Sequence, residues 1–146
     1  MKIFTIGFTQ KTAKDFFSKI KNNNIELLLD IRLNNTSQLA GFAKGKDLEY
    51  FLKEICSCEY VHDIAFSPTK ELLDNYRAKK IIWNEYENIF SEIMDKRHLS
   101  EIFKKLYMSK QNVCLLCTEP TPEQCHRRLV AEYLNKHIGN IEIIHI

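Results

Sequence analysis

The fold follows from one stretch, NVCLLCTEPTPEQCHRR, which occupies residues 112–128. Its first six residues form an apolar run with the length of a buried strand, and the run stops where a Thr-Glu-Pro-Thr-Pro loop begins. Thr121 is a good helix N-cap, Pro122 suits the first helical position, and Gln124 stands where a capping box needs it. The stretch therefore predicts a strand, a loop and a helix that begins just after Thr121.

The start of this predicted helix carries three reactive side chains, Cys125, His126 and Arg127. Unpaired backbone N–H groups and the positive end of the helix dipole favour an anion there and make a thiolate easier to form. The apolar residues further along repeat at helical spacing, and counting back four residues from them places Cys125 and His126 on the side that faces the sheet. Arg128 is expected to face water and to pair with Glu132.

Four more runs, over residues 2–6, 25–30, 59–62 and 141–146, read as strands, of which the third is short. A helix that Thr12 can cap separates the first two, and such a strand–helix–strand unit builds parallel sheets with right-handed crossovers. The sequence therefore predicts an α/β fold: a single three-layer domain with a mostly parallel central sheet flanked by helices.

Between these strands, residues 33–45 lose periodicity and predict a long loop, either a lid or binding loop or only a surface excursion. Gly139 is the expected end of the helix that begins near Thr121. The aromatic residues of the middle of the chain are expected to pack in the core rather than to stack on the bases of a nucleic acid. Helical spacing recurs over residues 48–55, 72–76, 83–94 and 99–107.

Composition bounds the class of protein. Hydrophobic residues make up 45% of the 146 residues, enough for one core, so residues 1–146 predict a single domain. The formal charge of +2 indicates neither a nucleic acid nor an acidic membrane surface as partner. No apolar segment has the length of a signal-peptide core or a membrane span, so a cytoplasmic protein is expected. The five cysteines are expected to be free thiols, and the oligomeric state stays open.

Polar side chains follow three of the predicted strands, at the point where each strand ends. Gly7 and Thr9 follow the first strand, Asp30 and Arg32 end the second, and Cys117 ends the strand of the opening stretch. Ligands of an open parallel sheet bind beyond the carboxyl ends of its strands, so these side chains are expected to meet. Arginine gives bidentate contacts to phosphate or carboxylate, which predicts a pocket for an anion.

These residues predict an enzyme that acts on an anionic small molecule bearing a phosphate or a carboxylate, such as a nucleotide, with no cofactor. A cysteine-dependent transferase or hydrolase fits this set of side chains. Two competing interpretations stay open, in which Asp30 and Arg32 form only a structural ion pair and Cys117 only fills apolar space. In the predicted site Cys117 or Cys125 is the nucleophile or redox thiol, Glu119, Asp30 and His126 move protons, and Arg32, Arg127, Gly7 and Thr9 bind the anion.

Several motifs, in order along nearly the whole chain, carry a family resemblance: Thr5-Ile6-Gly7, Leu28-Leu29-Asp30-Ile31-Arg32, Ser37 with Phe42, Tyr60-Val61-His62, and Cys117-Thr118-Glu119 followed by Cys125-His126-Arg127. Together they resemble a widespread prokaryotic family, the domain of unknown function DUF488. The resemblance implies a compact cytosolic α/β domain whose polar motifs cluster in one pocket, and it implies no particular reaction.

The chain departs from that family pattern at three places. Phe8 stands where a histidine commonly follows the glycine, Asn35 stands where a proline is usual, and residues 65–68 replace a Leu-Gly-Gly turn. A role for that histidine therefore does not transfer to this chain. The order of motifs also resembles the layout of rhodanese-like sulfurtransferases, in which a cysteine loop ending in arginine cradles an anion, and this likeness concerns layout alone.

Two other classes of protein compete with the enzyme. The same pocket can serve a non-catalytic module that recognises a nucleic-acid end or a partner. A structural zinc domain can use Cys117, Cys125 and His126 with Glu119 or His62, because thiolate and imidazole are the ligands that zinc prefers. The spacing argues against zinc, since adjacent Cys125 and His126 chelate awkwardly and no Cys-x-x-Cys stands at a suitable place, so no metal is predicted.

Overall fold

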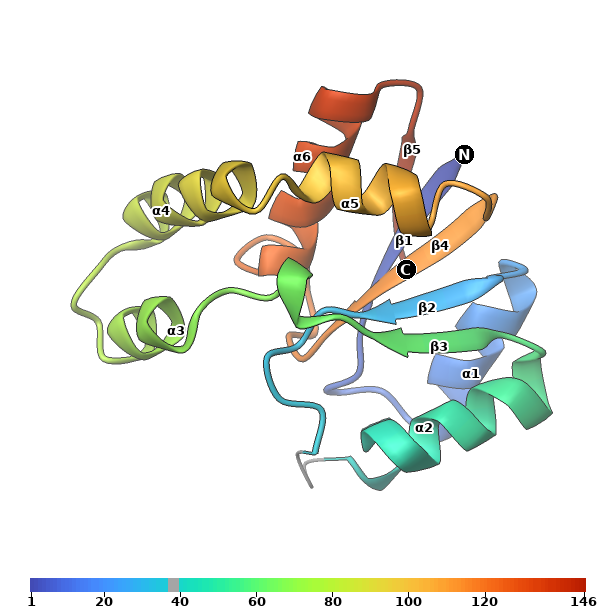
Figure 1. Ribbon diagram of the computed structural model, residues 1–146. Coiled ribbons are helices and arrows are strands. Elements are labelled where there is room, and N and C mark those ends of the chain that lie inside the picture. The colour runs from blue at the N-terminus through green and yellow to red at the C-terminus, as the bar shows by residue number, and fades with distance from the viewer. Residues whose placement is uncertain (37–39) are drawn as a thin grey trace.

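Five parallel strands form one sheet at the centre of the molecule (Figure 1). The computed structural model describes residues 1–36 and 40–146, so Ser37 of the quoted motifs lies outside the described residues. The strand order is β3-β2-β4-β1-β5, and every pairing is parallel, which confirms the predicted α/β class. The strands are β1 Lys2–Gly7, β2 Leu27–Asp30, β3 Glu59–His62, β4 Asn112–Cys117 and β5 Glu142–His145.

Helices cover both faces of the sheet and complete the three predicted layers (Figure 1). α1 and α2 lie on one face, α5 and α6 lie on the other, and α3 and α4 extend away from the sheet. No helix of the described residues is both long enough and apolar enough to cross a membrane. The helices are α1 Ala13–Asn22, α2 Gly45–Phe51, α3 Lys70–Arg77, α4 Trp83–Lys96, α5 Leu99–Leu106 and α6 His126–Ile138.

The side chains of the central strand β4 alternate between two cores, one on each face of the sheet. Val113 and Leu115 pack in the core that α4, α5 and α6 cover, whereas Cys114 and Leu116 pack in the core that α1 and α2 cover. All four side chains are fully buried, as expected of a strand covered on both faces. Cys117 follows Val113 and Leu115 in this alternation, so its side chain is directed toward the layer that contains α6.

Two predicted helix boundaries are confirmed. The hydroxyl of Thr12 accepts a hydrogen bond from the backbone N–H of Asp15 at 3.1 Å, so Thr12 is the N-cap of α1. The helix α6 ends at Ile138 and is followed by Gly139 with a φ of +78°. Glycine adopts this backbone conformation without a steric cost, which explains why the helix stops there.

The start of α6 differs from the prediction. The helix begins at His126 with Cys125 as its N-cap, in an extended conformation with φ −135° and ψ 136°, rather than just after Thr121. Pro122 is used in a turn instead, because its carbonyl oxygen accepts a hydrogen bond from the backbone N–H of Cys125 at 3.2 Å. Cys125 therefore precedes the first helical turn, and the loop between β4 and α6 is longer than predicted.

Gly7 ends β1 at the point where this loop passes closest to the sheet. A Cβ atom on Gly7 would lie 1.6 Å from the backbone carbonyl oxygen of Glu119, so no side chain fits. Thr9 fastens the same loop, since its backbone N–H and its hydroxyl donate to the carbonyl oxygen of Thr118 at 3.3 and 2.7 Å. Gly7 and Thr9 thus hold the backbone of the site loop against β1.

Replacing Gly7 with alanine should destabilise the fold, because the loop backbone must move away from the new methyl group. We expect the free energy of unfolding to fall by about 1–3 kcal/mol, the usual cost of overpacking. Chemical denaturation measures the change. The matched control is Gly41→Ala, where an added Cβ meets nothing within 4 Å and little change is expected. Equal effects of the two substitutions would contradict a close approach at Gly7.

Candidate active site

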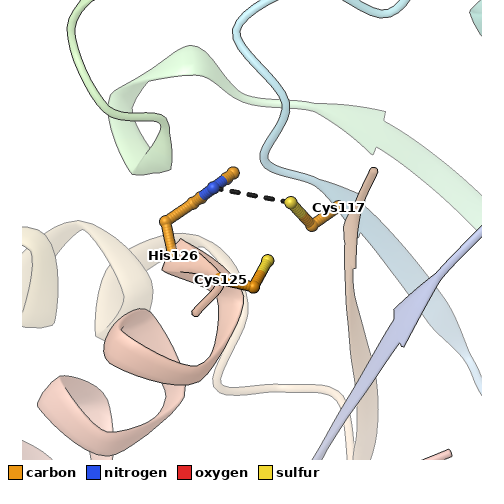
Figure 2. A group of neighbouring side chains, drawn as sticks. All are labelled: Cys117, Cys125 and His126. Carbon is orange, nitrogen blue, oxygen red and sulfur yellow. Dashed lines mark hydrogen bonds between the residues drawn. The ribbon is translucent and has the colours of Figure 1, made fainter. Parts of the chain in front are cut away.

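The thiol of Cys117 faces the imidazole of His126 where the end of β4 meets the start of α6 (Figure 2). Cys117 Sγ lies 3.4 Å from His126 Nδ1, and both side chains are buried. On the other side of the ring, His126 Nε2 lies 2.9 Å from the backbone carbonyl oxygen of Ile31, just beyond β2. A carbonyl oxygen can only accept, so Nε2 carries the hydrogen. Neutral His126 then presents Nδ1 as an acceptor, and Nδ1 can take the proton of the Cys117 thiol.

A second thiol, that of Cys125, completes the group (Figure 2). The ligand atoms of Cys117, Cys125 and His126 all lie within 4.8 Å of one another. Cys125 and His126 are buried against the sheet, whereas Arg128 is partly exposed and donates to Glu132 Oε1 at 3.0 Å and to Glu87 Oε1. This confirms the face of α6 that was predicted from its helical spacing.

The surroundings of the two thiols move their pKa values in opposite directions. Burial raises the pKa of Cys117, but a hydrogen bond from the Cys125 thiol, the backbone N–H of Glu119 and the charge of Arg127 together outweigh burial, and the pKa lies below its ordinary value. Burial, and then the neighbouring Cys117, raise the pKa of Cys125. Cys117 is therefore the more acidic of the two thiols, and Cys125 donates a hydrogen bond to its thiolate form.

The prediction that the start of α6 favours a thiolate at Cys125 is wrong. Cys125 is the N-cap of the helix and is 2% exposed, so desolvation of its sulfur is the largest influence on its pKa. The favourable groups instead converge on Cys117 at the end of the neighbouring strand. Sequence spacing could not separate the two sulfurs, because the difference depends on how the loop between them folds.

Arg127 is a buried guanidinium that holds this loop together. Its side chain is 1% exposed, and Nη1 donates to the backbone carbonyl oxygen of Glu119 at 2.6 Å and lies 3.5 Å from Cys125 Sγ. Within residues 1–36 and 40–146, no carboxylate forms a salt bridge with it. Its charge instead lowers the pKa of Cys117. Arg127 was predicted to bind the anion, but the structure places it behind the loop and next to the thiols.

Asp30 and Arg32 form a buried ion pair at the end of β2. Arg32 Nε and Nη2 donate to the two carboxylate oxygens of Asp30 at 2.8 and 2.6 Å, and the Tyr60 hydroxyl donates to the same carboxylate at 2.7 Å. With both oxygens engaged and no exposed surface, Asp30 positions Arg32. The guanidinium lies over the ring of Phe8, 5.1 Å from its centroid, so Phe8 supports Arg32.

A cleft of about 360 Å³ opens beside this group of side chains. Cys117, His126, Arg32 and Glu119 line it, whereas Asp30 and Arg127, which are buried behind it, do not. The remaining lining comes chiefly from α3 and α4: Leu73, Tyr76, Arg77, Trp83 and Tyr86. The structure therefore brings together the ends of β2 and β4, the start of α6 and the helices α3 and α4, whereas Gly7 and Thr9, which were also predicted to bind the anion, do not line this cleft.

The aromatic wall of this cleft was not predicted as part of a site. Tyr86, Phe90 and Met94 are buried in the core, as expected, but Tyr76 and Trp83 are only half-buried and line the cleft. Both lie at ends of their helices, where a side chain can leave the core. In the sequence, this position at a helix end was the sign that the two residues could line a site. The helical spacing of the aromatic residues, which indicates core packing, obscured that sign.

The same side chains offer ligands for a metal ion. Cys117 Sγ, Cys125 Sγ and His126 Nδ1 supply two sulfurs and a nitrogen, a donor set that suits zinc. The argument from spacing against this set is weakened, because the structure does bring the three side chains to one point. Cys114 forms a Cys-x-x-Cys motif with Cys117, but its side chain packs on the opposite face of the sheet and cannot join the three ligands.

The fold and site define a class: a small α/β domain with a parallel sheet and a cysteine–histidine pair at its carboxyl edge. The family model described as "Domain of unknown function DUF488" matches residues 12–134, and the chain belongs to this family. The matched region contains every site residue named above except Gly7, Phe8 and Thr9. No curated protein and no solved structure matches the chain.

As the pH is raised, the first thiolate absorbance of the folded protein should come from Cys117, whose pKa lies below its ordinary value. A lowered pKa means that the Cys117 thiolate persists to more acidic pH. The pKa values of the other four cysteines are raised, so the absorbance that appears at the lowest pH belongs to Cys117. An ultraviolet titration measures it.

Two variants control this titration. Cys117→Ser should remove it, whereas Cys125→Ser should keep it and move its midpoint to higher pH, because the thiolate loses a hydrogen-bond donor. A first titration that is unchanged in Cys117→Ser would assign the thiolate to another residue and contradict the assignment.

Proposed function

We propose that the protein is an enzyme that uses Cys117 as a nucleophile on an anionic small molecule bearing a phosphate or a carboxylate. The Cys117–His126 pair carries this proposal, because the hydrogen bond to Ile31 leaves His126 Nδ1 free to receive the thiol proton. The pair lines a cleft that a substrate can enter. The proposed setting is the cytoplasm, where thiols are kept reduced.

The proposed reaction is a two-step transfer or hydrolysis. In the first step the Cys117 sulfur bonds to an electrophilic carbon or phosphorus, the bond to the leaving group breaks, and the leaving group takes the proton held on His126 Nδ1. In the second step water or an acceptor hydroxyl gives a proton to His126 and attacks the same atom. The sulfur then departs as the Cys117 thiolate, so no cofactor or oxidant is required.

Two other lining residues have supporting roles in this proposal. Arg32 lines the cleft and is fixed by Asp30, so it can pair with the negative group of the substrate without reorganising. Glu119 is exposed at the same cleft and can exchange protons with bound water. Asp30 acts through Arg32 rather than on the substrate, since its two oxygens are already engaged.

The geometry of the two sulfurs and the imidazole favours a second candidate, a zinc site at Cys117, Cys125 and His126. A metal ion bound to the sulfur of Cys117 would make that sulfur unavailable as the nucleophile of the enzyme. The two candidates therefore predict opposite reactivity for Cys117, and a single labelling experiment separates them.

Alkylation by iodoacetamide at neutral pH, followed by mass spectrometry, should modify one cysteine, Cys117. The substitution His126→Leu should slow the labelling at least about tenfold, because general-base assistance is lost. The matched control is His137→Gln on the same helix, whose side chain binds the carbonyl oxygen of Tyr133 and lines no part of this cleft.

The other outcomes of this experiment identify the alternatives. Labelling of Cys117 that appears only after treatment with a chelator would favour zinc. An unreactive Cys117 in chelator-treated protein would overturn the nucleophile and leave a non-catalytic binding module, the second class of protein that the sequence permits.

A further inference from the structure

The cleft beside Cys117 has an aromatic wall and two arginine side chains, Arg32 and Arg77, and a nucleophilic cysteine alone does not explain them. Resting on the proposed function, we infer that the anion this cleft takes is a nucleotide, with its base on the ring surfaces of Tyr76 and Trp83 and its phosphate at Arg32 and Arg77. The inference deepens the proposed function by naming the class of substrate. It depends on the shape and polarity of the wall, on the two guanidiniums and on the size of the cleft.

The wall is a supported stack of rings. Trp83 stacks on Tyr86 with ring centroids 4.8 Å apart and an interplanar angle of 14°, and Tyr86 is 2% exposed, so the indole rests on the core. Tyr76 packs beside this pair at a tilt, with its ring centroid 5.5 Å from that of Trp83 and an interplanar angle of 58°. Half-buried rings with a rigid backing offer flat surface at little entropic cost, which suits a planar ligand.

The polar atoms of the two half-buried rings are already engaged. Trp83 Nε1 donates to Glu87 Oε1 at 2.8 Å, and the Tyr76 hydroxyl donates to Gln124 Oε1 at 3.0 Å. What Tyr76 and Trp83 can offer the cleft is therefore ring surface rather than hydrogen bonds. An aliphatic phosphate or carboxylate would leave this surface unused, whereas a base would cover it.

Two guanidiniums lie within the same lining. Arg32 is 3% exposed, and its Nη1 is a buried donor with no hydrogen-bond partner. A buried donor without a partner is costly, and a phosphate oxygen can satisfy it. Arg77, at the end of α3, is exposed and forms no salt bridge with any of the described residues. Its position lets it close on an anion from the open side of the cleft.

The remaining features are consistent with a mononucleotide. Glu119, the carboxylate of the lining, would repel a phosphate placed beside it but accepts hydrogen bonds from hydroxyls such as those of ribose. The volume of about 360 Å³ falls in the range of small-molecule sites, roughly 300–1,000 Å³. The cleft therefore combines two aromatic ring surfaces, a sugar-compatible carboxylate and two cations, the chemistry of a base, a ribose and a phosphate.

Intrinsic fluorescence tests this inference directly, because Trp83 is the only tryptophan of the chain. Cys117→Ser protein, which cannot turn a substrate over, is titrated with the common nucleoside monophosphates, with free nucleosides and with ribose phosphate. We expect saturable quenching by at least one monophosphate. Each part-ligand should bind at least about tenfold more weakly, because it lacks either the ring or the charge.

Substitutions in the lining locate the ligand. Tyr76→Ala and Arg77→Gln should each weaken binding about 5- to 100-fold, the range expected for one stacking or one charge-assisted contact. Tyr50→Ala and Lys79→Gln are the matched controls, since both residues are exposed and lie outside the lining, and they should leave binding unchanged. Circular dichroism of each variant verifies the fold.

A short oligonucleotide that ends in the best monophosphate distinguishes the two sources of a nucleotide. Tighter binding of the oligonucleotide would identify a strand end as the ligand, and equal or weaker binding would identify the free nucleotide. Either result supports the inference. The absence of saturable quenching by every monophosphate and oligonucleotide, or equal affinity for ribose phosphate, would overturn it.

The inference and the proposed function can fail separately. Nucleotide binding with an unreactive Cys117 would remove the nucleophile and keep the nucleotide site. A reactive Cys117 without nucleotide binding would keep the nucleophile and remove this substrate class.

Discussion

One hydrogen bond, from His126 Nε2 to the backbone carbonyl oxygen of Ile31, joins the start of α6 to the end of β2 and decides what the site can do. It assigns the hydrogen of the imidazole to Nε2 and turns Nδ1 toward Cys117 at the end of β4. The ring thus bridges two neighbouring strands of the sheet. His62 makes an equivalent bond to the carbonyl oxygen of Arg32 at 2.7 Å, so two imidazoles fix the backbone just after β2.

The site also depends on two buried guanidiniums that are neutralised in different ways. Arg32 is paired with Asp30, whose carboxylate accepts hydrogen bonds from Nε and Nη2, while Nη1 has no partner. Arg127 has backbone carbonyl oxygens and a sulfur around it, and its charge lowers the pKa of Cys117. A buried cation without a carboxylate favours an anion beside it. Gly7 allows the loop between β4 and α6 to pack closely against β1, and Arg127 holds that loop. The packing of the loop therefore affects the reactivity of Cys117.

Periodicity in the sequence predicted the layers and the buried face of α6, because a continuous apolar run needs cover on both sides and a helix repeats every 3.6 residues. Cys125 and His126 were therefore placed correctly against the sheet. The start of α6 was not predictable, because Pro122 closes a turn as readily as it opens a helix. Tyr76 and Trp83 share the spacing of core residues, and their place in the cleft depends on how α3 and α4 pack, which is tertiary information.

The most direct test of the central claim is nitrogen NMR of histidine-labelled protein, with His126→Gln used to assign the signal of His126. The account predicts that Nε2 of His126 carries its hydrogen at every pH at which the protein is folded, and that Cys117→Ser changes the signal of Nδ1. A neutral His126 that is protonated on Nδ1 and bare on Nε2 would contradict the account, because that ring could neither donate to Ile31 nor accept the proton of Cys117.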